Sequence, residues 1–202
     1  TRASDDARRD IRSAVDLHHR VMGLFPQGLG ETARRHAGVL FRLDEGPTGH
    51  HILIQSTLTP DPGRLEPAYG TARAKELTPL IGTLRTGQLI HYRITANATR
   101  KLGNNTTEGR PKQIVPLHGQ EAAQWWERQA ERAGLCLRSI QSTSLGDASG
   151  RRRDKHPVNH ARTRFDGLAE VRDATALVEH IVAGIGRGKS YGCGLLSVAP
   201  AR

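Results

Sequence analysis

Residues 173–199 read DATALVEHIVAGIGRGKSYGCGLLSVA, which predicts a helix, a glycine-rich loop and a strand in that order. Asp173 is a good N-cap, because its carboxylate can accept a hydrogen bond from the first free N–H groups of a helix. The apolar residues that follow recur at i, i+3, i+4, i+7 and i+8, as one face of an amphipathic helix requires, and they are Ala174, Leu177, Val178, Ile181 and Val182. Gly184 ends the helix, and residues 195–199 have strand composition.

Further elements precede this segment in a recognisable order. Residues 89–96 alternate as a strand, and residues 113–117 are expected to pair with them. A helix rich in Ala, Glu, Gln and Arg follows, and then two strands that flank a basic insert at residues 147–163; the expected ranges are 120–133, 135–142 and 164–171. Together with residues 173–199, this order predicts a ferredoxin-like βαββαβ unit.

The first half of the chain has a related pattern. Apolar residues at helical spacing predict a helix over residues 8–25, and residues 39–43 and 51–57 predict a β-hairpin. Residues 64–69 are a further short helix in this interpretation, and an opening strand is missing. The fold class expected is α+β, with two tandem ferredoxin-like (RRM-like) domains: an N-terminal domain of residues 1–88, and a C-terminal domain of residues 89–202 with the basic insert and the glycine-rich loop.

Charge narrows the class of partner. The 202 residues carry 30 Lys and Arg against 20 Asp and Glu, for a formal net charge of +10. Only Lys75, Lys101, Lys112, Lys155 and Lys189 are lysines, and arginine's planar fork suits phosphate and base edges. A basic balance of this size indicates a polyanionic partner, nucleic acid first and an acidic membrane second.

Other features of the composition argue against a disordered protein, a disulfide-rich protein and a membrane-spanning protein. Hydrophobic residues make up 36% of the chain and there are 22 glycines, which argues against wholesale disorder. Cys136 and Cys193 make neither a disulfide framework nor a metal cluster, and they fit a reducing compartment. No apolar run reaches the ~18 residues of a membrane span. A cytoplasmic protein without a membrane partner is therefore expected.

The segment 183–190 also fits a relaxed phosphate-binding P-loop pattern. A P-loop follows a strand and opens a helix, whereas this segment follows a helix and opens a strand, so nucleotide hydrolysis is excluded. Two interpretations of the glycines stay open: a flexible cationic loop against a phosphate backbone, or a helix–strand connection packed on the other domain. The glycines concerned are Gly184, Gly186, Gly188, Gly192 and Gly194.

Several motifs that lie far apart in the sequence resemble motifs of one protein family. Residues 184–200 resemble the C-terminal signature of the CasE family, the CRISPR repeat-processing endoribonucleases of E-subtype Cascade systems in the RAMP superfamily. Leu17-His18 with Leu24-Phe25-Pro26, and the segments 51–56 and 92–97, resemble the same family's helix and strand motifs. The resemblance implies the tandem fold. It also implies metal-independent cleavage at the 3′ base of the repeat hairpin in precursor CRISPR RNA, without a cofactor, and retention of the product with other Cascade subunits.

The resemblance makes His18 the catalytic residue. Its helical stripe, which it shares with Val15 and Met22, leaves a hydrogen-bonded core histidine as the alternative, and His19 is the fallback. Members of the family often carry tyrosine three residues before this histidine, where this chain has Val15. The second proton-transfer group is therefore open, with Tyr191 as one possibility and packing as the other role for that ring.

RNA binding is assigned to three cationic segments. They are Arg100 and Lys101, then Arg151, Arg152, Arg153 and Lys155 in the basic insert, and finally Arg187 and Lys189 in the glycine-rich loop. The remaining histidines have no metal-ligand spacing, and no metal site is expected. One tryptophan of the pair Trp125-Trp126 should pack inward, with base stacking as the alternative role. Two rival functions remain: a non-catalytic CRISPR RNA-binding structural subunit of the same superfamily and, more distantly, a DNA-binding module.

Overall fold

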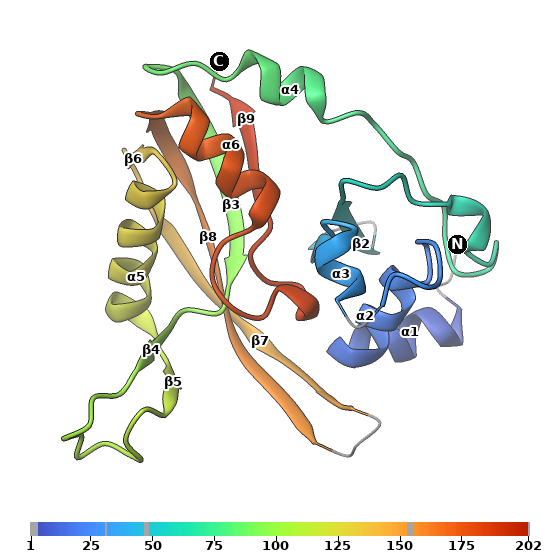
Figure 1. The fold of residues 1–202 in the computed structure, drawn as a ribbon, viewed down its shortest axis with the longest axis horizontal. Helices are drawn as coiled ribbons and strands as arrows, with labels where there is room; N and C mark the ends of the chain where they lie inside the picture. The colour runs from blue at the N-terminus through green and yellow to red at the C-terminus, as the bar shows by residue number, and fades with distance from the viewer. Residues whose placement is uncertain (1–3, 31, 47–48, 153–155, 202) are drawn as a thin grey trace.

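The computed structural model describes residues 4–30, 32–46, 49–152 and 156–201. Figure 1 shows two parts joined by a long connection: a smaller N-terminal part of helices and one hairpin, and a larger part built on a twisted sheet. In the described residues the first part contains α1 (Asp5–Arg12), α2 (Ala14–Met22), α3 (Ala33–His36), β1 (Leu40–Gly46), β2 (Gly49–Gln55) and the 3₁₀ turn η1 (Pro62–Arg64), and α4 (Thr78–Thr83) lies in the connection.

The single helix expected over residues 8–25 is two helices. Ser13 separates α1 from α2 with an extended backbone, and its Oγ accepts a hydrogen bond from Asp16 N at 3.2 Å. Serine at an N-cap satisfies an otherwise free backbone donor, which favours a new helix start at this position. The break lets α1 and α2 lie against each other (Figure 1).

The hairpin expected over residues 39–57 is confirmed. β1 and β2 pair antiparallel from Leu40 opposite Gln55 to Gly46 opposite Gly49. The inner side of this hairpin packs on α2, and the core of this part consists of Leu17, Val21, Leu24, Phe25, Ala37, Val39 and Phe41. The short helix expected over residues 64–69 is wrong, because the segment contains only the end of η1 and a turn.

The second part has the predicted βαββαβ order. The elements are β3 (Leu89–Ala96), β4 (Thr99–Lys101), β5 (Ile114–Pro116), α5 (Gly119–Arg132), β6 (Leu135–Leu137), β7 (Gln141–Arg151), β8 (Pro157–Val171), α6 (Ala174–Ala183), η2 (Lys189–Tyr191) and β9 (Leu196–Pro200). The five-stranded sheet has the order β6-β8-β3-β9, with β7 also paired to β8, and every pair is antiparallel. The last strand, β9, thus lies beside the first, β3, and β8 lies between β3 and β6.

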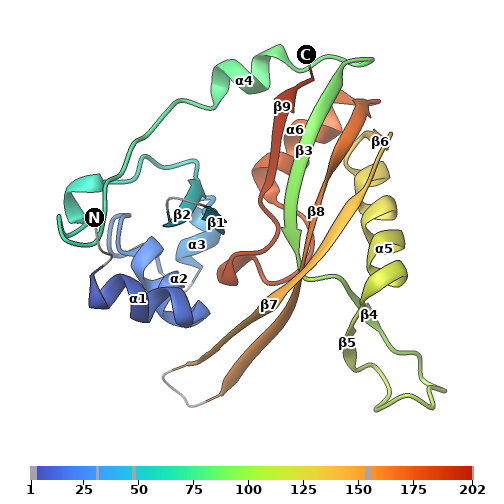
Figure 2. The same ribbon diagram turned by 180° about the vertical axis from the view of Figure 1, so that it is seen from behind.

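Helices α5 and α6 cover one face of this sheet and leave the other face without a helix, and the N-terminal part lies beside the β9 edge (Figures 1 and 2). Trp126 is fully buried between the helix and the sheet, where its ring stacks on Phe165 with centroids 5.8 Å apart. Trp125 is buried too, so both tryptophans pack inward. Burial of large aromatic rings supplies much of the stabilisation of such a core.

The pairing expected for residues 113–117 is wrong. β5 pairs with β4 in a separate hairpin, from Thr99 opposite Pro116 to Lys101 opposite Ile114. β3 already has β8 on one edge and β9 on the other, so its hydrogen-bonding groups have no room for a third strand.

The basic insert is part of the sheet rather than a loop. β7 and β8 extend through it as one long antiparallel hairpin, from Gln141 opposite Asp166 to Arg151 opposite Pro157, with a bulge between Leu145 and Ala148. The small and charged residues of this stretch hide the strand alternation, because one side of the hairpin faces solvent. The hairpin projects beyond the sheet toward α1 and α2 (Figure 1).

Buried Arg42 of β1 joins the two parts. Its guanidinium forms an ion pair with Asp44, and its Nη1 donates a hydrogen bond to Ser197 Oγ of β9 at 2.9 Å.

The whole fold is tandem ferredoxin-like: the second unit is complete, and the first unit consists of its helix and hairpin. A domain boundary at residue 88 coincides with the residue before β3 and stays a prediction. No described helix has the length and apolar character needed to span a membrane.

Candidate functional site

Three elements meet around His18. Helix α2 contacts β7 on one side and η2 of the glycine-rich loop on the other. The His18 ring is half-buried, and it contacts the Tyr191 ring of η2 edge to face, with centroids 6.1 Å apart and an interplanar angle of 62°. Val15 and Leu17, which flank it on α2, are buried and hold the helix in place.

The environment of His18 keeps its imidazole neutral. Burial lowers the pKa of His18 from its ordinary value of 6.5 to about 4, and the charges of His19 and Arg34 contribute to the lowering. Its Nδ1 is buried and has no hydrogen-bond partner among the described residues. A core histidine that serves only packing ordinarily has its ring nitrogens hydrogen-bonded, so the unpartnered Nδ1 argues against the core-histidine alternative. His19 is exposed, with its ring 5.8 Å from that of His18.

Tyr191 is held from two further sides. The His160 ring of β8 stacks on it with centroids 5.3 Å apart and 25° between the planes. Arg152 donates a hydrogen bond from Nε to the Tyr191 hydroxyl at 3.1 Å. The pKa of His160 is lowered by burial and by the charges of Arg187 and Arg152. The site thus contains two imidazoles and one phenol within ring contact.

Sequence reasoning missed His160 and Arg34. His160 was grouped with histidines that lack metal-ligand spacing, and its partners lie on other elements, far away in the sequence. No local sequence pattern marks His160: its place opposite Ala148, on the hairpin that carries Gly150 and packs on α2, follows from the β7–β8 register. Arg34 of α3 donates to Val39 O at 2.8 Å and places a half-buried positive charge near His18.

The five glycines of the loop all have positive φ, between 73° and 88°. Three of them pack against the rest of the fold: a Cβ on Gly184 would lie 2.7 Å from Leu40 Cδ2, one on Gly186 3.1 Å from Trp125, and one on Gly194 2.6 Å from Ile185 O. Gly188 and Gly192 flank η2 in the left-handed conformation. The loop is therefore a packed helix–strand connection, which touches the first part of the fold through Leu40. Its contact with a phosphate backbone stays a prediction.

The described members of the predicted RNA-binding set lie on three segments: β4, the end of the β7–β8 hairpin and the glycine-rich loop. Arg187 is exposed, and its backbone bridges to Asn97 just beyond β3. Lys189 is half-buried, and its Nζ donates to Ala183 O at the end of α6 at 2.8 Å. Arg100 of β4 pairs with Glu108, and Lys101 is exposed. Arg151 is the last residue of β7 and Arg152 follows it, whereas Arg153 and Lys155 lie outside the described residues.

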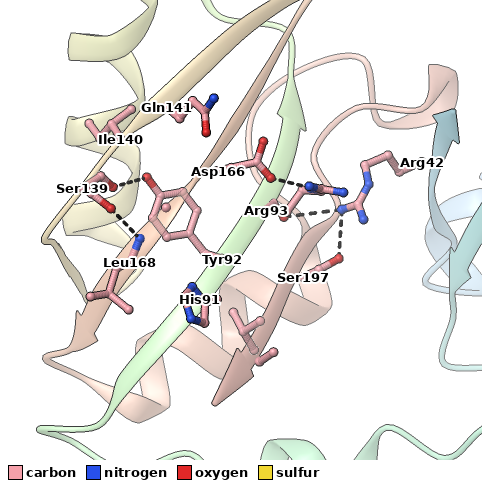
Figure 3. A pocket seen from close by; sticks show the side chains of 13 residues that line it. Arg42, His91, Tyr92, Arg93, Ser139, Ile140, Gln141, Asp166, Leu168 and Ser197 are labelled. Carbon is pink, nitrogen blue, oxygen red and sulfur yellow. Dashed lines mark hydrogen bonds and ion pairs between the residues drawn. The ribbon is translucent and has the colours of Figure 1, made fainter. Parts of the chain in front are cut away.

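A separate cavity of about 710 Å³ lies on the open face of the sheet. Figure 3 shows its lining, in which Arg42 reaches Ser197, Arg93 pairs with Asp166, and Tyr92 donates to Ser139 O. None of the site residues predicted from the sequence lines it. Within residues 4–30, 32–46, 49–152 and 156–201 no group of three or more His, Cys, Asp or Glu is placed to hold a metal ion.

The comparisons with known proteins agree with one another. The chain is 28% identical to the CRISPR-associated endoribonuclease Cse3 of Thermus thermophilus over 98% of its own length and 95% of that protein. It is also 28% identical to the CRISPR system Cascade subunit CasE of Escherichia coli, over 96% of each chain. A solved structure of Thermus thermophilus Cse3 bound to an RNA representing a pre-cleavage complex matches with a TM-score of 0.79 and 28% identity, over 98% of this chain and 94% of that one.

A family model described as CRISPR associated protein matches residues 1–200. The similarity to Cse3 and CasE is confirmed over nearly the whole length of each relative, rather than in isolated motifs. The chain belongs to the family of CRISPR-associated proteins.

Proposed function

We propose that this protein is an endoribonuclease that cleaves precursor CRISPR RNA at the 3′ base of the repeat hairpin and keeps the product as a subunit of a Cascade-type assembly. The observation that carries the proposal is the half-buried His18, with an unpartnered ring nitrogen, at the meeting point of the cationic loop and the β7–β8 hairpin. The relatives that cover nearly all of this chain carry the names of a CRISPR-associated endoribonuclease and a Cascade subunit. A cytoplasmic location belongs to the proposal.

His18 acts on the nucleophile. At neutral pH its imidazole is neutral, because its pKa is about 4, so a ring nitrogen can accept the proton of the RNA 2′-hydroxyl. The 2′-oxygen then attacks the adjacent phosphorus, and the products are a 2′,3′-cyclic phosphate and a 5′-hydroxyl. No metal is required in this scheme, because the nucleophile belongs to the RNA itself.

The cations bind and stabilise the phosphate. Arg34 places its charge near the His18 ring, and Arg152 and Arg187 place theirs near the His160 ring. Guanidinium groups form charge-assisted hydrogen bonds to the oxygens of a phosphorane. Arg187 and Lys189 of the loop, Arg151 to Arg153 and Lys155 of the hairpin, and Arg100 and Lys101 of β4 are proposed to follow the RNA backbone on either side of the scissile bond.

The test uses a labelled repeat-hairpin RNA in EDTA, beside the same RNA with one 2′-deoxy nucleotide before the scissile bond. Cleavage of the first RNA alone, by the wild type and by His19→Gln but not by His18→Ala, is the expected result. Cleavage by His18→Ala at the wild-type rate would remove the enzyme assignment as stated.

Two other results of the same experiments would favour the two alternative functions. Tight binding without cleavage of either RNA would move the protein to a non-catalytic CRISPR RNA-binding subunit. Equal affinity for a DNA hairpin of the same sequence would favour the DNA-binding module, since only RNA offers the 2′-hydroxyl and the A-form groove.

A further inference from the structure

Cleavage by the 2′-hydroxyl needs a second proton transfer, to the 5′-oxygen that leaves. This requirement rests on the proposed function, in which His18 takes the first proton. The donor has to lie near His18, because attacking and leaving oxygens are on opposite sides of one phosphorus atom. The structure therefore has to supply a group that carries a proton at neutral pH within a few ångströms of the imidazole.

The Tyr191 ring lies in edge contact with the His18 ring, with centroids 6.1 Å apart, and its hydroxyl can donate a hydrogen bond as well as accept one. Arginine Nε can only donate, so in the 3.1 Å bond from Arg152 the phenol oxygen is the acceptor. The hydrogen of the phenol is not used in this bond, so the hydroxyl can donate it to an oxygen of a bound RNA. The guanidinium also stabilises the negative oxygen that remains after the proton has left.

The ring is fixed in position by its neighbours. His160 stacks on one side, and the edge contact to His18 restrains it on another. Gly188 and Gly192, both in the left-handed conformation, flank the single turn that carries Tyr191, and a Cβ on Gly192 would lie 3.4 Å from Phe41 of β1. A group held this firmly is preorganised for transfer rather than recruited at the moment of reaction.

The neighbouring candidates fit less well. Burial lowers the pKa of His160 below 6.5, so this ring carries no spare proton at neutral pH. Lys189 Nζ donates one of its hydrogens to Ala183 O at the end of α6, whereas Tyr191 is in ring contact with His18. Arginine does not give up its proton in proteins.

We propose that the Tyr191 hydroxyl donates the proton to the leaving 5′-oxygen while His18 accepts the proton of the 2′-hydroxyl. In this step the O2′–P bond forms and the P–O5′ bond breaks. One proton passes from O2′ to His18 and another from Tyr191 Oη to O5′. The imidazolium and the phenolate that remain are reset when one proton moves from His18 to Tyr191 through solvent. Arg152 and His160 are positioning residues for the phenol.

The experiment compares Tyr191→Phe with the wild type on two RNAs under single-turnover conditions. One RNA is the natural repeat hairpin, and the other has sulfur in place of the bridging 5′-oxygen at the scissile phosphate. A thiolate leaves without protonation, since a free thiol has a pKa of only ~8.5. Phenylalanine keeps both ring contacts and removes only the hydroxyl. Tyr92→Phe is the matched control, because its hydroxyl donates to Ser139 O in the separate cavity.

We expect Tyr191→Phe to cleave the natural RNA about 10²–10⁴-fold more slowly and the sulfur-substituted RNA within about tenfold of the wild type. His18→Ala should be slow on both RNAs, and Arg152→Gln should lose more of the rate on the natural RNA than on the sulfur-substituted RNA, because Arg152 also holds the phenol. Equal cleavage of the natural RNA by Tyr191→Phe and wild type overturns the inference, and so does an equal loss on both RNAs, which would mean a positioning role. If the wild type cleaves neither RNA, the proposed function fails and this inference with it.

Discussion

Val15 and Gly150 are packed so closely that a Cβ on Gly150 would lie 2.9 Å from Val15 Cγ2. This contact joins α2 to the β7–β8 hairpin, which carries Arg152 and His160. The positions of His18 and of the groups that hold Tyr191 are therefore coupled through one valine and one glycine. The absence of a side chain at residue 150 is a condition for the site.

Gly150→Ala should destabilise the protein by ~1–3 kcal/mol, because the new methyl group overpacks the contact with Val15. Alanine ordinarily stabilises a strand relative to glycine, so the sign of the effect is diagnostic. Denaturant unfolding measures it. Gly146→Ala, in the same hairpin but with nothing within 4 Å of its Cβ, is the control and should be neutral or stabilising.

A double-mutant cycle isolates the contact. In a Val15→Ala background the Cγ2 atom is gone, so the cost of Gly150→Ala should shrink by ~0.5 kcal/mol or more. Strictly additive changes in unfolding free energy would show that the two residues do not constrain each other.

Tyrosine at position 15 should not improve catalysis in this protein. Val15 is 5% exposed beneath the hairpin, so a phenol there would have to displace β7. We expect Val15→Tyr to cost ~1–3 kcal/mol of stability and to leave cleavage of the repeat hairpin no faster than in the wild type. A faster variant would mean that a phenol on α2 is the missing group and that Tyr191 does not supply it.

The second ferredoxin-like unit could be predicted because its elements have clean periodicity. Helix α6 has an N-cap and a regular apolar face, and the pairing of β3 with β8 joins two strands of alternating pattern. The break at Ser13 was missed because both helices place apolar residues at compatible spacing, so the pattern crosses the break without interruption.

The partners of His18 could not be predicted in the same way. His160 and Arg34 reach the site from β8 and α3, and strand pairing and helix packing, not local pattern, bring them there. His18 itself was found through the family's motif, and Tyr191 through its place in the glycine-rich loop. The glycines were ambiguous because packing against Leu40 or Trp125 is a tertiary property.

Acid should destabilise the fold through His18. Its pKa is about 4 in the folded protein and near 6.5 in the unfolded chain, so the unfolded chain binds more protons between these values. The unfolding free energy therefore falls as the pH is lowered from 6.5 to 4. The charges that face the ring are His19 on α2 and Arg34 on α3, and both disfavour its protonation.

His18→Gln should lose less stability over this pH window than the wild type, by ~1–2 kcal/mol. A tenfold change in proton affinity is worth ~1.4 kcal/mol, and solvent screens the half-buried ring in part. The measurement is the unfolding free energy of both proteins at about pH 7 and pH 4.5. Parallel pH profiles would show that the ring is not desolvated. His160→Gln should change the profile in the same direction, because the pKa of His160 is also lowered.

Arg187→Ala should weaken the binding of the repeat hairpin and reduce the salt slope of binding by about one or less, as expected for the loss of one phosphate contact. Arg187 is exposed on the glycine-rich loop, and its backbone bridge to Asn97 fixes its place beside the proposed RNA path.

Arg85→Ala is the matched control for Arg187→Ala, because Arg85 is an exposed arginine that precedes β3, whereas Asn97 follows β3. The eight residues of β3 rise ~3.4 Å each, which separates the two arginines by about 25 Å. Affinity measured from about 50 to 300 mM salt, with uncleavable 2′-deoxy RNA, gives both slopes. If Arg85→Ala reduces the salt slope of binding as much as Arg187→Ala does, the RNA lies along the whole sheet rather than at the end that carries His18.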